Sequence, residues 1–303
     1  MTKVRTIEGV GIGWKPELAD DRDYIFEDRS ADKMLTMEQL QAIRQHPDPN
    51  LLGPRRNQHA EGSCVGHGTS AAANRLARQD TDTRNNNAVY SPRSNYNWAR
   101  ILEAGKVDFS GEFPTVVDPG SALKEDNGAY VRDGVLALRK VGTCPESSWK
   151  YRAHIRAGDS APGANDFKLV PSESRIKAAR RFRVEAQRCN TVEGFLSALA
   201  AGYPVVYGTV CHTGLWRPEV DRTGVWGLPK KGDRNDGGHC MCAHWFDPTI
   251  SVDEFSIVIF SENSWSDGYA PESPSGIAGC VTQPIEYIKR RLIDDSWAIV
   301  TEV

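Results

Sequence analysis

The sequence predicts an α+β protein, because its helical and strand-like patterns lie in different halves of the chain. The three largest candidate helices carry small or apolar residues at helical spacing and cover 64–77, 91–104 and 131–141. The candidate strands are rich in β-branched and aromatic residues and cover 203–210, 239–246, 254–261 and 295–302. Helices that precede strands along the chain are typical of this fold class.

Local start signals support two further helices. Thr36 is a helix cap with Gln39 three residues later, a capping box that predicts a helix over 37–46. Thr191 similarly precedes an amphipathic segment over 192–201.

The larger helices carry their own boundary signals. A run of small residues after Ser63 predicts that a buried helix starts near Cys64. Pro92 is suited to the first position of the next helix, and Gly142 ends the third.

The remaining segments predict loops or solvated faces. Residues 1–35 are rich in glycine and acidic residues and hold only short strand-like pieces, such as 23–26. Proline and glycine predict a loop over 47–62, and polar residues predict an inserted loop over 152–176. The arginine-rich run over 175–183 is best interpreted as a solvated helix face.

Composition excludes several classes of protein. The 303 residues include 37 basic and 40 acidic side chains, so the net charge of −3 gives no reason to expect a nucleic-acid partner. No long uncharged apolar run predicts a membrane span, and the N-terminus lacks the apolar core of a signal peptide. We therefore expect a cytoplasmic or virion-associated protein. Seven cysteines are an odd number without an export signal, so at least one thiol should be free.

Three short motifs carry the residue types that a cysteine nucleophile requires. They are Asn57–Cys64, Asp236–His239 and Glu262–Trp265. Such a nucleophile needs a lowered thiol pKa, a base held in one tautomer, and donors for a developing oxyanion.

Each requirement has a candidate. Cys64 lies at a predicted helix start, where the helix dipole favours a thiolate and its own N–H is free to donate. Gln58 offers a side-chain amide from the entering loop. His239 follows Gly238 and is the candidate base, Asn263 can orient its ring, and Trp265 can shield that hydrogen bond from water.

In this order the motifs resemble those of the papain-like cysteine peptidases, and most closely divergent bacterial and phage-type members without the usual propeptide. The resemblance spans roughly residues 50–300. It implies that Cys64 is the nucleophile, His239 the general base and acid, Asn263 the orienting residue and Gln58 the oxyanion-hole glutamine.

The resemblance also implies substrate-binding positions. Asn127-Gly128-Ala129 is similar to the family's Asn-Gly-Gly segment, which pairs with the substrate backbone, and Gly238 and Trp265 flank the catalytic histidine and asparagine. The stretch 131–149, a helix followed by a Pro-Glu-x-x-Trp turn, is similar to the bacterial subset.

Three residues depart from the family pattern. Glu61 replaces a cysteine that anchors a disulfide, Val65 replaces an aromatic residue beside the nucleophile, and Ser266 stands where glycine is usual. None of these changes removes a catalytic group, but they leave the substrate preference open.

The resemblance implies a two-lobed fold, with a helical lobe, an antiparallel β-barrel-like lobe and the active-site cleft between them. We expect an N-terminal extension over 1–50 and a peptidase domain over 51–303. Within that domain we expect the helical lobe at about 51–150 and the β lobe at about 185–303. Insertions at about 152–176 and 212–236 account for the long spacing between the motifs.

Two alternatives stay open. Cys240, Cys242 and His244 could bind zinc, but they alternate with His239 on the predicted strand and lack a fourth ligand, which favours core packing and no metal or other cofactor. In function, the leading hypothesis is a peptidase with a polypeptide substrate. The alternative is a papain-fold binding or structural component, for example of a phage particle or another larger assembly, with weak, latent or no activity.

Overall fold

The computed structural model describes residues 5–7, 10–17, 20, 23–79, 89–152, 166–179 and 182–300. The α-helices are α1 (Phe26–Arg29), α2 (Met37–Ala42), α3 (Cys64–Gln79), α4 (Pro92–Ala104), α5 (Val131–Lys140), α6 (Glu173–Ala179), α7 (Val192–Ala200), α8 (Pro218–Thr223) and α9 (Glu286–Lys289). Short 3-10 helices are η1 (Ala31–Lys33), η2 (Pro49–Leu51), η3 (Asp166–Lys168) and η4 (Thr213–Trp216).

The strands form one large sheet and three small ones. The large sheet has the order β11-β10-β9-β8-β12-β7, and all of its neighbouring strands are antiparallel. Its strands are β7 (Glu185–Arg188), β8 (Val205–His212), β9 (Asn235–Val252), β10 (Phe255–Glu262), β11 (Cys280–Pro284) and β12 (Ile293–Val300). The small sheets pair β1 (Arg5–Ile7) with β2 (Val10–Ile12), β3 (Trp14–Lys15) with β6 (Ala129–Tyr130), and β4 (Lys106–Asp108) with β5 (Thr115–Asp118).

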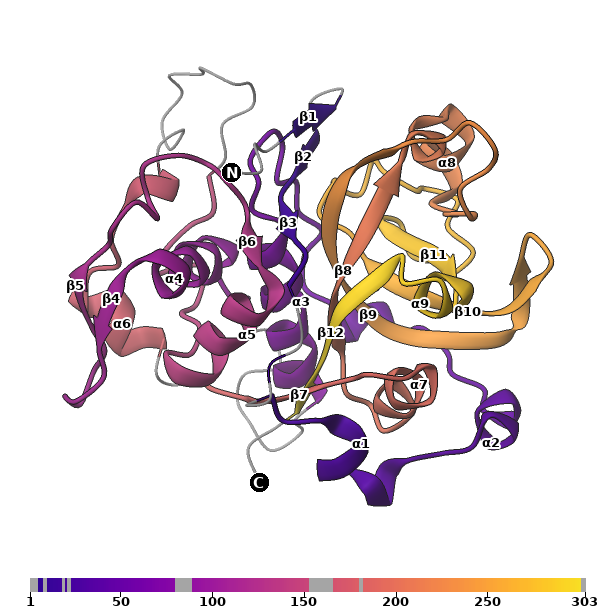
Figure 1. The fold of residues 1–303 in the computed structure, drawn as a ribbon, viewed down its shortest axis with the longest axis horizontal. Coiled ribbons are helices and arrows are strands. Elements are labelled where there is room, and N and C mark those ends of the chain that lie inside the picture. The colour runs from indigo at the N-terminus through magenta and orange to yellow at the C-terminus, as the bar shows by residue number, and fades with distance from the viewer. Residues whose placement is uncertain are drawn as a thin grey trace.

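The predicted α+β two-lobed layout is confirmed. Helices α4, α5 and α6 gather on one side of the molecule, and the large sheet occupies the other, with α3 between them (Figure 1). One hydrophobic cluster, which includes Cys64, Val65, Val206 and Ile299, joins α3 and α5 to the sheet. A second cluster, which includes Phe195, Tyr207 and Trp226, fills the space between the sheet and α7.

Most of the predicted elements are present, with shifted ends. The capping box at Thr36 and Gln39 forms as expected, and Ser91 and Thr191 cap α4 and α7 through side-chain hydrogen bonds. The strand expected over 239–246 is much longer, because β9 runs for 18 residues and pairs with β8 on one side and β10 on the other.

One local prediction is wrong. The strand-like piece 23–26 forms only an isolated bridge between Ile25 and Arg188, and Phe26 begins α1 instead. The acidic residues Glu27 and Asp28 lie in the first turn of α1, where the helix dipole favours them. Of the arginine-rich run over 175–183, residues up to Ala179 belong to α6, and residues 180 and 181 lie outside the described part of the chain.

The first strands of the chain cross to the centre of the molecule. Figure 1 shows β2 and β3 between the helical side and the large sheet, close to the start of α3. We call residues 10–15 the N-terminal strap. Within the strap, β3 pairs in parallel with β6, with Trp14 opposite Ala129 and Lys15 opposite Tyr130. The strap therefore lies against the region in which the sequence places the functional residues.

Candidate active site

Cys64 is the first residue of α3, as predicted, and small residues let this helix pack closely on its neighbours. A Cβ atom on Gly66 would lie 2.4 Å from the carbonyl oxygen of Pro92 at the start of α4. A Cβ atom on Gly68 would lie 3.0 Å from the sulfur of Cys240 on β9. The glycines of α3 thus bring the Cys64 end of the helix against the strand that carries His239.

The thiol of Cys64 is fully buried between the strap and the sheet. The backbone amides of Gly13, in the strap, and of Cys240, directly after His239, lie close enough to donate to its sulfur. Burial outweighs these donors and raises the pKa of Cys64 to about 11. In this arrangement the thiol is protonated at neutral pH.

His239 and Asn263 meet as predicted, from neighbouring strands. His239 lies on β9, Asn263 directly follows β10, and His239 Nε2 lies 2.8 Å from Asn263 Oδ1. This contact makes Nε2 the donor and leaves Nδ1 as the basic nitrogen, which has no hydrogen-bond partner within the described part of the chain. Burial lowers the pKa of His239 to about 4, so the ring is neutral.

Aromatic rings surround this pair. The ring of Trp265, which is expected to shield the hydrogen bond of His239 to Asn263 from water, lies 4.8 Å from the His239 ring at an interplanar angle of 31°. Trp226 and Trp216 each lie 5.7 Å from Trp265. Both come from the stretch 212–236, which sequence reasoning treated only as an insertion, and no motif in the sequence pointed to their position.

Gln58 is also at the site, and its amide is fully engaged. Its Nε2 atom donates to the carbonyl oxygens of Gly11 at 2.8 Å and Glu61 at 2.7 Å. Its Oε1 atom accepts a hydrogen bond from the hydroxyl of Ser264. The side chain predicted to hold an oxyanion therefore holds a carbonyl oxygen of the strap.

Gly128 and Ala129 contact the same strap. The N–H of Ala129 donates to the carbonyl oxygen of Gly13 at 3.0 Å, and Gly128 has a left-handed backbone with φ of 74°. A Cβ atom on Gly128 would lie 1.9 Å from that carbonyl oxygen, so only glycine fits. The segment that the resemblance assigns to the substrate backbone thus pairs here with the strap of the same chain.

The strap fits tightly because it is rich in glycine. Cβ atoms on Gly11 and Gly13 would lie 2.2 Å and 2.4 Å from the carbonyl oxygens of Glu61 and Gly62. The N–H of Gly11 also donates to the carbonyl oxygen of His59 at 2.6 Å. The alternating Gly11-Ile12-Gly13 was a signal of close backbone approach that the sequence analysis did not use.

Glu61 has a specific partner in the helical lobe. Arg93, at the start of α4, contacts both of its carboxylate oxygens at 2.6 and 2.7 Å, and neither side chain is accessible to solvent. Arg93 also donates to the carbonyl oxygen of Arg152 at 2.6 Å. The residue that replaces a family disulfide cysteine thus ties its loop to α4 by a buried ion pair.

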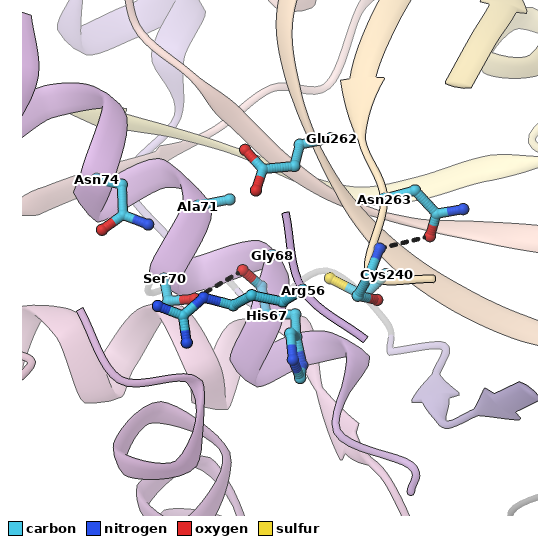
Figure 2. Close-up of a pocket in the computed structure, with 10 residues that line it drawn as sticks. Arg56, His67, Gly68, Ser70, Ala71, Asn74, Cys240, Glu262 and Asn263 are labelled. Atoms are coloured by element: carbon cyan, nitrogen blue, oxygen red, sulfur yellow. Dashed lines mark hydrogen bonds between the residues drawn. The ribbon is translucent and has the colours of Figure 1, made fainter. Parts of the chain in front are cut away.

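A second polar cluster lies behind the site. A cavity of about 10 Å³ lies between α3, which contributes His67, Ser70 and Asn74, and the end of β10, with Glu262 and the next residue Asn263. Figure 2 shows how these side chains are arranged. His244 lies 3.4 Å from Glu262, which also pairs with Arg55 at 3.1 Å. Cys240 and Cys242 pack in the hydrophobic cluster around Cys64, and no group of three metal-ligating side chains occurs among the described residues.

Comparisons with known proteins agree with this geometry. Over 182 residues, 59% of this chain, the sequence is 29% identical to the uncharacterized peptidase C1-like protein L477 of Acanthamoeba polyphaga mimivirus. That match covers 54% of the viral protein, so the chain spans about half the length of the curated relative it matches. No protein-family model matches the chain.

Solved structures match over more of the chain. Xylellain, a cysteine protease from Xylella fastidiosa, aligns over 100% of both chains with a TM-score of 0.71 and 25% identity. Procathepsin B from Trypanosoma congolense aligns over 96% of this chain and 87% of its own with a TM-score of 0.60, and at 10% identity it shows the fold alone.

The fold is therefore that of the two-lobed thiol proteases, with a helix that begins at a cysteine beside an antiparallel sheet. In fold and in sequence the chain is similar to the papain-like cysteine peptidases, as a divergent relative. Within the described residues, no helix has both the length and the apolar character needed to cross a membrane.

Proposed function

We propose that the protein is a cysteine peptidase that hydrolyses peptide bonds through Cys64, His239 and Asn263. The observation that carries this proposal is the 2.8 Å hydrogen bond between His239 Nε2 and Asn263 Oδ1, beside the first turn of α3 and covered by Trp265. This bond leaves His239 Nδ1 free to take a proton, which is what a general base for a neighbouring thiol requires.

The proposed reaction has two steps. His239 Nδ1 accepts the Cys64 proton, and the thiolate attacks a substrate carbonyl while the N–H of Cys64 and Nε2 of Gln58 stabilise the oxyanion. The imidazolium gives its proton to the leaving amine, which leaves a thioester. Water, deprotonated by His239, then hydrolyses the thioester and restores the thiol.

We further propose that the strapped arrangement is latent. Substrate cannot reach Gln58 Nε2 while the Gly11 carbonyl occupies it, nor pair with Ala129 while Gly13 does. The raised pKa of Cys64 and the lowered pKa of His239 both follow from burial beneath the strap, and both oppose the reactive ion pair. On this proposal residues 51–303 form the peptidase domain, and the extension over 1–50 supplies the occupant.

The strap also supports a second candidate, a papain-fold component that binds partners without turnover. A site filled by its own chain is compatible with either role. The two differ in what happens when the strap is released, because only a peptidase then gains a reactive thiol and hydrolyses peptides.

The deciding experiment is hydrolysis of a fluorogenic peptide library by the full chain and by a variant with a weakened strap, Trp14→Ala. We expect turnover in Trp14→Ala that is lost when Cys64→Ala is added. Cys144→Ala is the matched control, because Cys144 is a buried thiol in a separate hydrophobic cluster and its loss should leave turnover intact. A Trp14→Ala variant with an alkylatable Cys64 but no hydrolysis would support the binding role.

A further inference from the structure

A cavity of about 260 Å³ lies in the β lobe, between η4, α8 and the turn that joins β9 to β10. Aliphatic side chains from these segments form part of its wall, among them Leu215, Val220 and Val252. Cys64, His239, Asn263 and Gln58 do not line it, so the cavity is separate from the proposed active site.

His212, the last residue of β8, brings an acceptor without a donor to this cavity. Its Nε2 lies 3.2 Å from the carbonyl oxygen of Gly227 and 3.0 Å from the hydroxyl of Tyr287, which itself donates to that carbonyl at 2.7 Å. Because the carbonyl oxygen only accepts, Nε2 carries a hydrogen. Burial lowers the pKa of His212, so the ring is neutral at neutral pH and Nδ1 is an acceptor. Within the described part of the chain, this Nδ1 has no hydrogen-bond partner.

The carboxylate of Asp233 faces the same nitrogen. Its Oδ2 lies 3.6 Å from His212 Nδ1, and the two side chains are 9% and 5% exposed. The backbone N–H of Lys230 donates to Oδ2 at 2.8 Å and lowers the pKa of Asp233, so the carboxylate is ionised. Arg217, which is largely exposed, pairs with the other carboxylate oxygen at 3.2 Å. Two acceptors therefore face each other, an unfavourable arrangement for buried groups that a donor between them would relieve.

Gly214 keeps the space beside these two acceptors open. A Cβ atom on this residue would lie 2.6 Å from Asp233 Oδ2 and 2.9 Å from His212 Nδ1. The φ of Gly214 is not positive, so the backbone does not demand glycine here and the need is for space. Because Gly214 and His212 both line the cavity, the gap between the acceptors adjoins it.

The two acceptors and the aliphatic wall define the ligand chemistry. A primary ammonium group has three N–H donors, enough for both acceptors, and its charge strengthens the bond to a carboxylate. A hydroxyl group has only one proton to share between them, and a quaternary ammonium has none. A bound metal ion fits less well, because no group of three metal-ligating side chains occurs among the described residues.

We propose that the cavity beside His212, Gly214 and Asp233 is a binding site for a primary ammonium group on an aliphatic chain, as in a lysine side chain or a free alkylamine. One N–H bonds to His212 Nδ1 and another to Asp233 Oδ2, while the aliphatic chain packs against Leu215 and Val220. This inference does not depend on the proposed peptidase function, because it concerns binding at a separate site.

The first test is a binding titration of the full chain, followed by saturation-transfer NMR. We expect pentylamine to bind, and pentanol and pentyltrimethylammonium to bind at least about 10-fold more weakly, because neither offers charged N–H donors. Nα-acetyl-lysine methylamide represents the peptide source, with Nα-acetyl-norleucine methylamide as its control without the ammonium. Tighter binding of the lysine compound than of pentylamine would assign the site to a polypeptide, and the reverse to a free amine. Equal binding of pentylamine and pentanol, or no binding of either ammonium compound, would overturn the proposal.

The second test compares two carboxylates of the same region. Asp233→Asn removes the charge but keeps an oxygen for the Lys230 N–H, and it should weaken pentylamine binding by about 10- to 100-fold. Asp253→Asn is the matched control, because Asp253 lines the same cavity away from His212 and asparagine tolerates its φ of 53°. Its affinity should equal that of the unmodified chain.

Gly214→Ala gives an independent check, because its methyl group fills the gap between the two acceptors and should abolish binding. Circular dichroism establishes that each variant is folded, and the Gly214→Ala result decides the matter if Asp233→Asn does not fold. Equal weakening by Asp233→Asn and Asp253→Asn, or unchanged binding in Gly214→Ala, would contradict the proposed site. None of these measurements requires peptide hydrolysis, so failure of the peptidase function would leave their outcome unaffected.

Discussion

Gln58 donates a hydrogen bond of 2.8 Å from its side-chain Nε2 to the carbonyl oxygen of Gly11, 47 residues earlier in the chain. The donor is the one that sequence analysis assigns to an oxyanion, and the acceptor belongs to the chain's own N-terminal strap. This hydrogen bond therefore joins the proposed oxyanion donor to the strap that blocks it. A substitution of either residue should alter both catalysis and the protection of Cys64 by the strap.

The first prediction concerns the anchor of the strap. Replacing a buried tryptophan by alanine costs about 3–5 kcal/mol, and for Trp14 that loss falls on the strap and its contacts with the sheet. Because 1.4 kcal/mol changes an equilibrium tenfold, we expect Trp14→Ala to raise the rate of Cys64 alkylation at least about 10-fold. The measurement is mass-spectrometric labelling with iodoacetamide.

The control for this experiment is Phe109→Ala, which removes an exposed aromatic side chain elsewhere on the molecule. Its alkylation rate should equal that of the unmodified chain. Equal rates for Trp14→Ala and Phe109→Ala would contradict the role of the strap as a cover.

A second prediction concerns Gln58 itself. In the Trp14→Ala background, Gln58→Ala should lower kcat by about 10²–10³, the usual loss for an oxyanion donor. In the unmodified chain, the same change removes a bond to the strap, so Cys64 alkylation should become faster. Gln58→Ala should thus lower kcat in steady-state kinetics of the Trp14→Ala background and raise the alkylation rate of Cys64 in the otherwise unmodified chain. A loss of stability alone, seen as equal changes in both assays, would contradict this dual role.

These two residues also show how far the sequence could predict the site. Motif order and helix-start chemistry sufficed to place Cys64 at the start of α3 and His239 beside Asn263, because those features depend on local sequence and on strand alternation. The strap could not be placed in this way. Its contacts join Gly11 and Gly13 to residues about 50 to 115 positions away, and short glycine-rich strands carry too little pattern to fix a partner.

The ion pair of Glu61 and Arg93 was missed for a related reason. Sequence reasoning noted Glu61 as a departure from a family cysteine, but a lone arginine in a helix gives no sign of its partner. Likewise, the fold class followed from the order of helices and strands, whereas β7 and β11 were missed because each is only four or five residues long.

That ion pair gives a third prediction. Removing one partner of a buried pair leaves an uncompensated charge, so Glu61→Leu or Arg93→Met should each cost about 3–5 kcal/mol in free energy of unfolding. The double variant Glu61→Leu with Arg93→Met should lose less than either single change, because no buried charge remains. Denaturant unfolding of the four proteins measures the coupling. Additive losses in the double variant would show that the two side chains act independently.

The last prediction concerns acid pH. Burial lowers the pKa of His67 to about 3 and that of His244 to about 4, whereas in an unfolded chain both titrate near 6.5. Between these values the unfolded state binds more protons than the folded one, so stability rises with pH through this window. The contribution of the two neutral, buried histidines to stability is fully present above about pH 6.5 and is lost progressively as the pH falls toward 4. His67 is the better probe, because it lies on α3, donates from Nδ1 to the Ser63 carbonyl oxygen at 3.0 Å, and packs edge-on against Tyr151. Only the protonated or Nδ1–H ring can donate to that carbonyl, so the neutral folded form is the Nδ1–H tautomer.

The measurement is denaturant unfolding between about pH 4.5 and 7.5, which spans the window of these two pKa shifts. We expect the free energy of unfolding to change less steeply with pH for His67→Gln than for the unmodified chain. The exposed His46→Gln should keep the original slope, and an unchanged slope in His67→Gln would contradict the assignment.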